Sequence, residues 1–134
     1  MTGSKEQKAV QVDPSGISRN PAAEKDSRPE AHPFNDDQLQ CAAFLAKSLS
    51  DGNRLRILLL LSGGRKSVSA IVEALSLSQP LVSHHLKELK RSLLVRVDRE
   101  GPFIYYELSD RRILNILKAL SDMATDLLSE RKTF

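Results

Sequence analysis

The spacing of apolar residues along the chain predicts a series of helices interrupted by one β-hairpin. The first helix, over residues 36–49, is apolar on nearly all sides, which is typical of a helix that is buried on two faces. One face consists of Leu39, Ala42, Ala43, Ala46 and Leu49, and the opposite face is largely covered by Cys41, Phe44 and Leu45.

Three more helices are predicted before the hairpin. Residues 50–64 predict the second, and residues 65–75 predict a short extended piece followed by the third, with Ser69 as its N-cap. After a tight turn, Ser78 is expected to cap the fourth helix, in whose first turn Pro80 is tolerated.

The apolar period changes from helical to alternating over residues 93–108. Val95 and Val97 alternate with polar residues there, and a Gly-Pro pair marks the tip of a hairpin. A long amphipathic helix follows over residues 109–130, with an apolar stripe made of Ile113, Ile116, Leu117, Leu120, Ala124 and Leu127. A helix–turn–helix followed directly by a charged hairpin is the order of a winged helix. The predicted fold class is therefore mainly α with a β-hairpin.

Residues 1–33 differ in composition from the rest, and we expect them to form a disordered tail. Apolar residues are sparse there, four of the six prolines fall in this segment, and its five basic residues balance its five acidic ones. Such a stretch cannot bury enough apolar surface to fold alone. Residues 34–134 are expected to form the folded domain, and they carry the whole net charge of +3, as 15 basic minus 12 acidic residues.

The fourth predicted helix has an apolar side and a basic side. Its apolar residues fall in one narrow arc, at about 100° per residue, and consist of Val82, Leu86, Leu89 and Leu93. Residues 75–99, which include this helix, hold five basic against two acidic residues, and this concentration of positive charge favours DNA as a partner. In that interpretation the helix enters the major groove, so that Gln79, Ser83 and His84 reach base edges. The basic residues of the helix and of the hairpin then meet the DNA backbone. The candidate DNA-binding residues are Ser78, Gln79, Pro80, Ser83, His84, Lys87, Lys90, Arg91, Arg96 and Arg99.

Each of these assignments has a plainer alternative. The basic side of the helix could be ordinary solvated surface, and Arg96 and Arg99 could serve only the solubility of the hairpin. His84 and His85 point about 100° apart, so they cannot easily bind one metal ion together. His84 lies on the polar side, whereas His85 lies at the edge of the buried arc and is expected to be packed.

Other features narrow the class of protein. The one cysteine, Cys41, excludes a disulfide within the chain and favours a reducing compartment. The N-terminal residues contain no apolar signal core, and the longest apolar run, residues 57–61, is too short to span a membrane. We therefore expect a cytoplasmic protein with no membrane partner. No phosphate-binding glycine loop, HExxH or GxSxG pattern occurs, so an enzyme is not expected.

Three segments, in this order, resemble the bacterial ArsR/SmtB-type winged-helix repressors. They are LSDGNRLRILLLL (49–61), LSLSQPLVSHHLKEL (75–89) and LVRVDREGPFIYYEL (94–108). The resemblance implies a homodimer, with the first and last helices at the interface, that binds a double-stranded DNA operator and blocks transcription until a signal weakens binding. Residues 34–134 are then a winged-helix DNA-binding and dimerisation domain. The candidate interface residues are Leu39, Phe44, Leu45, Leu117, Leu120 and Leu127.

The positions at which many members of that family bind a signal differ in this chain. The Cys-x-Cys pair at the start of the third helix corresponds to Ser67 and Ser69, and hydroxyl groups are poor ligands for thiophilic ions. The Asp-x-His run that binds zinc in other members corresponds to residues 110–112, where Arg112 replaces the histidine. No metal site and no cofactor are therefore expected.

Cys41 and the choice of function leave alternatives open. Cys41 is interpreted either as a small buried residue or as a redox-sensitive thiol that pairs with Cys41 of a second copy across the dimer. The candidate functions are a metal-independent dimeric repressor, a redox or unusual metal sensor acting through Cys41, and a winged helix that contacts proteins without binding DNA. The basic side of the fourth helix argues against the last, because a protein-docking helix more often exposes apolar residues.

Overall fold

The computed structural model describes residues 33–131, so the predicted tail lies, except for Pro33, outside the described residues. Internal contacts divide the described residues into two units, which meet between Gln38 and Leu39. The boundary falls inside the first described helix, and the packed core lies within the second unit.

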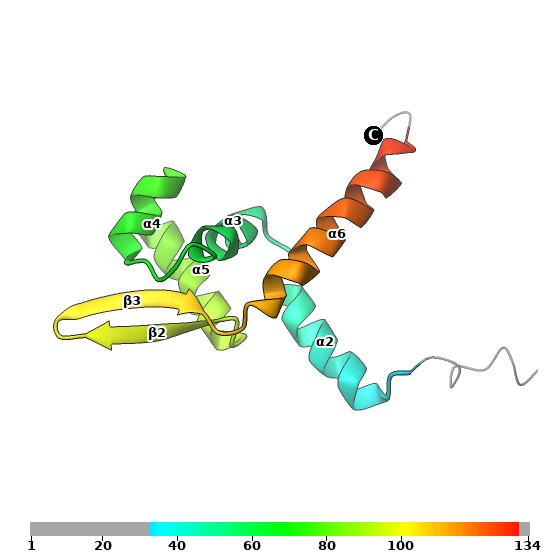
Figure 1. Ribbon diagram of the computed structural model, residues 1–134, viewed down its shortest axis with the longest axis horizontal. Helices are drawn as coiled ribbons and strands as arrows, with labels where there is room; N and C mark the ends of the chain where they lie inside the picture. The colour runs from blue at the N-terminus through cyan, green and yellow to red at the C-terminus, as the bar shows by residue number, and fades with distance from the viewer. Residues whose placement is uncertain (1–32, 132–134) are drawn as a thin grey trace, which may run out of the picture. The chain divides into compact units, whose positions relative to one another are not determined.

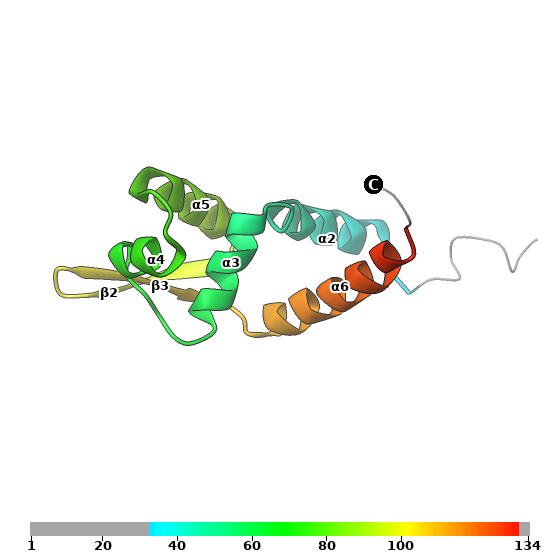
Figure 2. The ribbon, with the colours of Figure 1, turned by 90° about the horizontal axis from the view of Figure 1, so that it is seen from above.

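The described residues form five helices and one two-stranded antiparallel hairpin (Figures 1 and 2). The elements are α2 (Asp36–Ser48), α3 (Gly52–Leu61), α4 (Val68–Leu75), α5 (Gln79–Arg91), β2 (Val95–Glu100), β3 (Phe103–Leu108) and α6 (Arg112–Ser129). This order confirms the predicted winged helix, in which α4 and α5 form the helix–turn–helix and β2 and β3 form the wing. Among residues 33–131, no helix combines the length and apolar character needed to cross a membrane.

Serine side chains fix the starts of both helices of the helix–turn–helix. The Oγ atom of Ser67 accepts a hydrogen bond from the backbone N–H of Ala70 at 3.1 Å and begins α4. The prediction that Ser69 caps this helix is wrong, because Ser69 already lies inside the first turn. Ser78 caps α5 as predicted, where its Oγ atom accepts from the backbone N–H of Leu81 at 3.3 Å.

The apolar core forms where α3, α4 and α5 meet the base of the wing and the first turns of α6. Its buried residues are Ile57, Leu58, Leu61, Ile71, Val82, Leu86, Leu89, Leu94, Val95, Leu108, Ile113 and Leu117. Three of the four residues in the predicted arc of α5 belong to this set. The core therefore sets the rotation of α5 about its own axis, and with it the side of α5 that faces solvent.

Leu93, the fourth residue of that arc, does not pack into the core, because α5 ends at Arg91. The chain leaves the helix through a Schellman motif, in which the backbone N–H of Leu93 donates to the carbonyl of Lys90 and that of Leu94 donates to the carbonyl of Leu89, both at 3.0 Å. Leu93 takes the left-handed position of this motif, with φ of 68°, and its side chain is 75% exposed. Glycine is usual at this position, and a bulkier residue in such a conformation costs about 1–3 kcal/mol.

Backbone hydrogen bonds tie the wing to the helix–turn–helix. The register from Val95↔Leu108 to Glu100↔Phe103 leaves Gly101 and Pro102 as a two-residue loop. Gly101 has φ of 61°, the positive value that such tight hairpin loops require at their first residue. At the other end of the wing, Lys66 pairs with Tyr106 through two hydrogen bonds of 2.8 and 2.9 Å. The segment that leads into α4 thus joins the edge of the wing.

The cap of α4 can be tested by a pair of substitutions. We expect Ser67→Ala to lower the free energy of unfolding by about 1 kcal/mol, because an N-terminal N–H of α4 loses its acceptor. Ser69→Ala should change this free energy by a few tenths of a kcal/mol at most, since Ser69 is exposed inside the helix. Urea denaturation of both variants measures the difference, and equal losses would contradict the assignment of Ser67 as the cap.

Candidate nucleic-acid interface

Helix α5 turns its apolar side to the core and its polar side to solvent. Val82, Leu86 and Leu89 are almost fully buried. The exposed residues include all ten that the sequence predicts to contact DNA, namely Ser78, Gln79, Pro80, Ser83, His84, Lys87, Lys90, Arg91, Arg96 and Arg99. Eight of these residues lie on α5 or its N-cap, so the helix offers them together to a partner.

The exposed side of α5 carries positive charge that is only weakly compensated. Within the described part of the chain, Lys87 and Lys90 form no ion pair, whereas the Arg91 Nη1 atom lies 3.2 Å from each carboxylate oxygen of Glu88. An exposed pair of this kind contributes little energy, so Arg91 can exchange Glu88 for a phosphate at small cost. The start of the helix adds the partial positive charge of the helix dipole.

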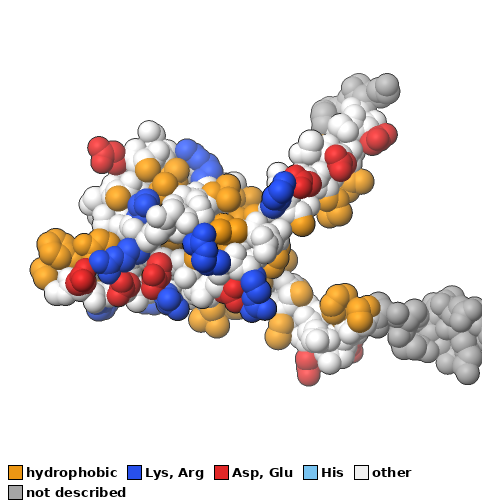
Figure 3. Space-filling model, viewed as in Figure 1, with side chains coloured by type: hydrophobic (Ala, Val, Ile, Leu, Met, Phe, Trp, Pro, Cys, Tyr) orange, Lys and Arg blue, Asp and Glu red, His pale blue; other side chains and the backbone are white. Residues whose placement is uncertain are grey.

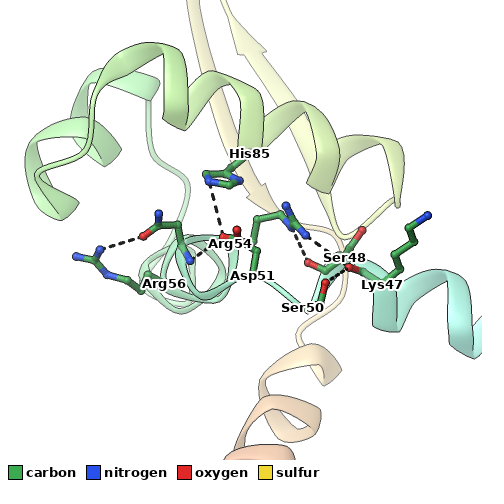
Figure 4. Close-up of polar contacts among 8 residues, drawn as sticks. Lys47, Ser48, Ser50, Asp51, Arg54, Arg56 and His85 are labelled. Atoms are coloured by element: carbon green, nitrogen blue, oxygen red, sulfur yellow. Dashed lines mark hydrogen bonds and ion pairs between the residues drawn. The ribbon is translucent and has the colours of Figure 1, made fainter.

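The two neighbouring histidines of α5 lie in different environments. His84 is exposed, whereas His85 is buried, with 4% of its surface exposed, which confirms the predicted packing of His85. The Nε2 atom of His85 lies 3.7 Å from the Oδ1 atom of Asp51 (Figure 4), and its buried Nδ1 atom has no hydrogen-bond partner. Burial lowers the pKa of His85, and Arg54 and His84 lower it further, while Asp51 and Glu88 oppose the shift.

Asp51 and Arg54 join three helices beside this histidine. The Oδ1 atom of Asp51 caps α3 by accepting the backbone N–H groups of Asn53 at 2.8 Å and Arg54 at 3.1 Å. These bonds, the one from Arg54 first, hold the pKa of the Asp51 carboxyl below its usual value. The Arg54 guanidinium in turn donates to the carbonyl of Ser48 at 2.7 Å, at the end of α2 (Figure 4). The junction links α2, α3 and α5, so His85 has a structural position and not a DNA-facing one.

The wing carries more acidic than basic side chains, and Arg65 offsets the excess. Arg65 precedes α4 and pairs with both Asp98 and Glu100 at 2.5 Å, and its guanidinium carbon lies 4.2 Å from the centre of the Tyr105 ring. Nothing in the sequence around Arg65 indicates this role, because its partners lie more than 30 residues away and no local pattern connects them. The single positive charge of Arg65 offsets part of the negative charge of these two carboxylates, which would otherwise repel a phosphate backbone more strongly.

The two arginines of the wing differ in whether a carboxylate of the chain already pairs with them. The Arg96 Nε atom lies 2.8 Å from the Oε2 atom of Glu107, its cross-strand neighbour. Arg99 points to the opposite face of the hairpin and forms no ion pair among residues 33–131. Large apolar side chain surface is exposed near the tip, where Phe103 is 60% exposed beside Pro102, and hydrophobic side chains gather at the end of the wing in Figure 3. Arg99 is therefore the wing cation best placed to meet a phosphate.

The candidate interface helices expose apolar residues, with one exception. Leu39, Phe44 and Leu45 of α2 and Leu120 and Leu127 of α6 are all exposed in the single chain, and apolar side chains follow one edge of α6 in Figure 3. Leu117 instead packs into the core of its own chain, with 7% of its surface exposed, which leaves little of it for a partner. Cys41 of α2 is exposed, so its interpretation as a small buried residue is wrong for the single chain.

The residues that the family resemblance matches to metal ligands make other contacts in this structure. The Oγ atom of Ser67 serves as the cap of α4. Asp110 accepts hydrogen bonds from the backbone N–H and the guanidinium of Arg112 at 2.7–3.1 Å, which lowers the pKa of Asp110 to about 2. Across residues 33–131, no three His, Cys, Asp or Glu side chains are grouped so as to hold a metal ion.

Comparison with known proteins matches this arrangement to transcriptional regulators. The family model described as bacterial regulatory protein, arsR family, matches residues 51–97, which run from the cap of α3 into β2. The chain is 34% identical over 88 residues to an HTH-type transcriptional regulator of Methanocaldococcus jannaschii, MJ1325, covering 65% of this chain and 99% of that protein. It is 43% identical over 63 residues to the transcriptional repressor SdpR of Bacillus subtilis, covering 47% and 70% of the two chains.

A solved structure shows the same fold. The homodimeric winged helix-turn-helix DNA-binding domain Mb0332 of Mycobacterium bovis, described as a possible ArsR-family regulator, superposes with a TM-score of 0.62 at 28% identity. The match covers 77% of this chain and 98% of that domain.

Burial of His85 predicts a loss of stability in mild acid. The folded protein binds a proton at His85 less readily than the unfolded chain does, because the pKa in the folded state is below 6.5. The free energy of unfolding is therefore highest, as far as His85 is concerned, above pH 6.5. It falls as the pH drops from there toward the pKa of the folded state, by at most about 1.4 kcal/mol per pH unit for one proton. Urea denaturation between pH 5 and 7.5 measures this slope. His85→Leu should flatten it and His84→Ala should not, and a slope that survives in His85→Leu would assign the effect to another group.

Proposed function

The chain belongs to the ArsR family of bacterial regulatory proteins, and on that premise we propose that it is a homodimeric repressor in which α5 reads the major groove of an operator. The observation that carries the proposal is the exposed side of α5. It combines groups that can hydrogen-bond to base edges with unpaired cations, and the core holds it in one orientation. No metal ion is required for any of these features.

The residues of α5 divide into two roles. Ser83 and His84 lie in the middle of the exposed side, where short polar side chains can reach base edges in the major groove. Lys87, Lys90 and Arg91 lie toward the end of the helix and meet phosphates, which supply affinity without sequence preference. Ser78, Gln79 and Pro80 form the start of the helix, where the partial positive charge of the helix dipole favours a phosphate.

The wing adds backbone contacts on the flank of the site. Arg99 has no competing carboxylate among the described residues, whereas Arg96 has to leave Glu107 before it can bind a phosphate. We therefore assign Arg99 the larger contribution. The apolar side chains near the tip and the carboxylates of the wing, which Arg65 offsets only in part, make the wing a secondary source of affinity next to α5.

Homodimer formation follows from the apolar residues that α2 and α6 leave exposed. A two-fold symmetric pair of winged helices binds two half-sites about 34–36 Å apart, one helical turn of DNA. A dimer bound across such a site excludes other proteins from it, which is the simplest form of repression. A function limited to protein contact is less well supported, because the exposed side of α5 is polar and basic.

Fluorescence anisotropy can separate the base-reading and phosphate-binding roles of α5. Binding is measured to the DNA upstream of the gene that encodes this protein and to a scrambled duplex, over a salt series without added metal. We expect Ser83→Ala and His84→Ala each to reduce the preference for the upstream DNA by about 1–3 kcal/mol. Lys87→Ala should weaken binding to both duplexes alike and reduce the salt slope by about 0.9.

The matched control for Lys87 is Lys118→Ala, since Lys118 lies on α6 and pairs with Asp122 at 3.0 Å. This variant should bind as the unmodified protein does. An upstream-DNA preference that stays unchanged in both Ser83→Ala and His84→Ala would refute the placement of α5 in the major groove.

Charged substitutions on α6 test the dimer. Leu120→Glu and Leu127→Glu place carboxylates on the exposed apolar stripe, and each should weaken the dimer by about 2 kcal/mol, the scale of one buried leucine side chain. Glutamate is a good helix former, so the single chain should remain folded. Sedimentation velocity measures the change, with Leu59→Glu on α3 as the control. A dimer that survives both α6 substitutions would move the interface elsewhere.

A further inference from the structure

Leu93 combines two features that the packing of the single chain does not explain. Its backbone is in the left-handed region at φ of 68°, where glycine would fit without strain, and its side chain is more exposed than any other large apolar side chain among the described residues. The Schellman hydrogen bonds at the end of α5 involve only the backbone, so they do not require a leucine. Residues held in such a backbone conformation cluster at functional sites, including the places where a ligand is held.

The surroundings of Leu93 form an apolar groove. A cavity of about 530 Å³ is lined by residues of α2, of the turn after α5 and of the loop before α6. Its lining includes Cys41, Phe44, Leu45, Leu93 and Leu94. A smaller adjoining cavity of about 200 Å³ shares Leu45, Leu93 and Leu94 and extends along α6 to Ile113 and Ile116. Leu93 thus connects the exposed apolar faces of α2 and α6.

We propose that Leu93 is an anchor of the homodimer, inserted against a second copy of this chain. This inference rests on the proposed homodimer and extends it to a residue that lies on neither interface helix. The groove is continuous with the surface that α2 and α6 expose, because Phe44 and Leu45 belong to both. An exposed apolar side chain in such a surface is removed from water when a second copy covers it, and this burial favours association.

The polar groups at the edge of the groove fit a protein partner. Asp110 and Arg112 line its margin and pair with each other, so neither presents an uncompensated charge. A polar rim around an apolar centre is the usual arrangement of a protein–protein interface. DNA would require cations in this position, and the groove lining supplies none besides the paired Arg112.

Two substitutions separate the contact made by Leu93 from the strain in its backbone. Leu93→Ala removes the side chain and keeps a non-glycine residue, whereas Leu93→Gly removes the side chain and the strain together. Sedimentation equilibrium of the full chain should show a dimer dissociation constant raised about tenfold or more in both variants. Leu59→Ala is the matched control, because Leu59 is also an exposed leucine, 54% exposed on α3, and should leave the constant unchanged.

Cys41 gives a local measurement inside the groove. As the one cysteine of the chain and a lining residue, it should react with a thiol reagent more slowly as protein concentration rises and dimers form. In Leu93→Ala this protection should shift to about tenfold higher concentration, and far-UV circular dichroism establishes that the variant is folded.

The outcomes distinguish this inference from the proposed dimer. If both Leu93 variants keep the dimer dissociation constant and the Cys41 protection of the original protein, Leu93 is not an anchor of the dimer. The proposed homodimer itself would still stand. An unmodified protein that sediments as a monomer at all concentrations would count against the homodimer of the proposed function itself. A weaker dimer in Leu93→Ala alone, with a normal dimer in Leu93→Gly, would assign the effect to backbone geometry and overturn the contact.

Discussion

Burial of one side of α5 is the constraint on which the rest of the protein depends. Val82, Leu86 and Leu89 lie in the core with residues of α3 and α4, and each contributes on the order of 1.5–3 kcal/mol through the apolar surface that it removes from water. A helix held by three such residues cannot rotate without exposing them. The direction in which Ser83, His84 and Lys87 face is therefore a consequence of core packing and not of any contact that these residues make.

Polar contacts between distant segments add the orientation that apolar packing alone does not specify. Asp51 caps α3 and Arg54 donates to a carbonyl at the end of α2, so hydrogen bonds join these two helices, and the buried ring of His85 on α5 lies beside Asp51 at 3.7 Å. Arg65 and Lys66 perform the corresponding task for the wing, through side-chain and backbone bonds respectively. His85 is the weak point of this arrangement, because its Nδ1 atom is buried without a partner.

Large apolar side chains outside the core remain exposed in the single chain. Helices α2 and α6 each expose a row of large apolar side chains, and the strained Leu93 lies in the groove that connects them. Exposed apolar patches usually mark a contact with a partner. The surface proposed to face DNA and the surface proposed to face a second copy thus differ in chemistry, polar on α5 and apolar on α2 and α6.

The sequence by itself determined the element order, the buried side of α5 and the set of exposed polar residues on it, because these depend on local periodicity and on capping residues such as Ser78. It identified the family through three contiguous segments for the same reason. Only the tertiary structure decided that Ser67 and not Ser69 begins α4, that Leu93 leaves the arc and becomes exposed, and that Leu117 belongs to the core. It also revealed the pairing of Arg65 with Asp98 and Glu100. These features depend on where one helix ends and on which residues distant in the chain come together, and a local pattern does not contain that information.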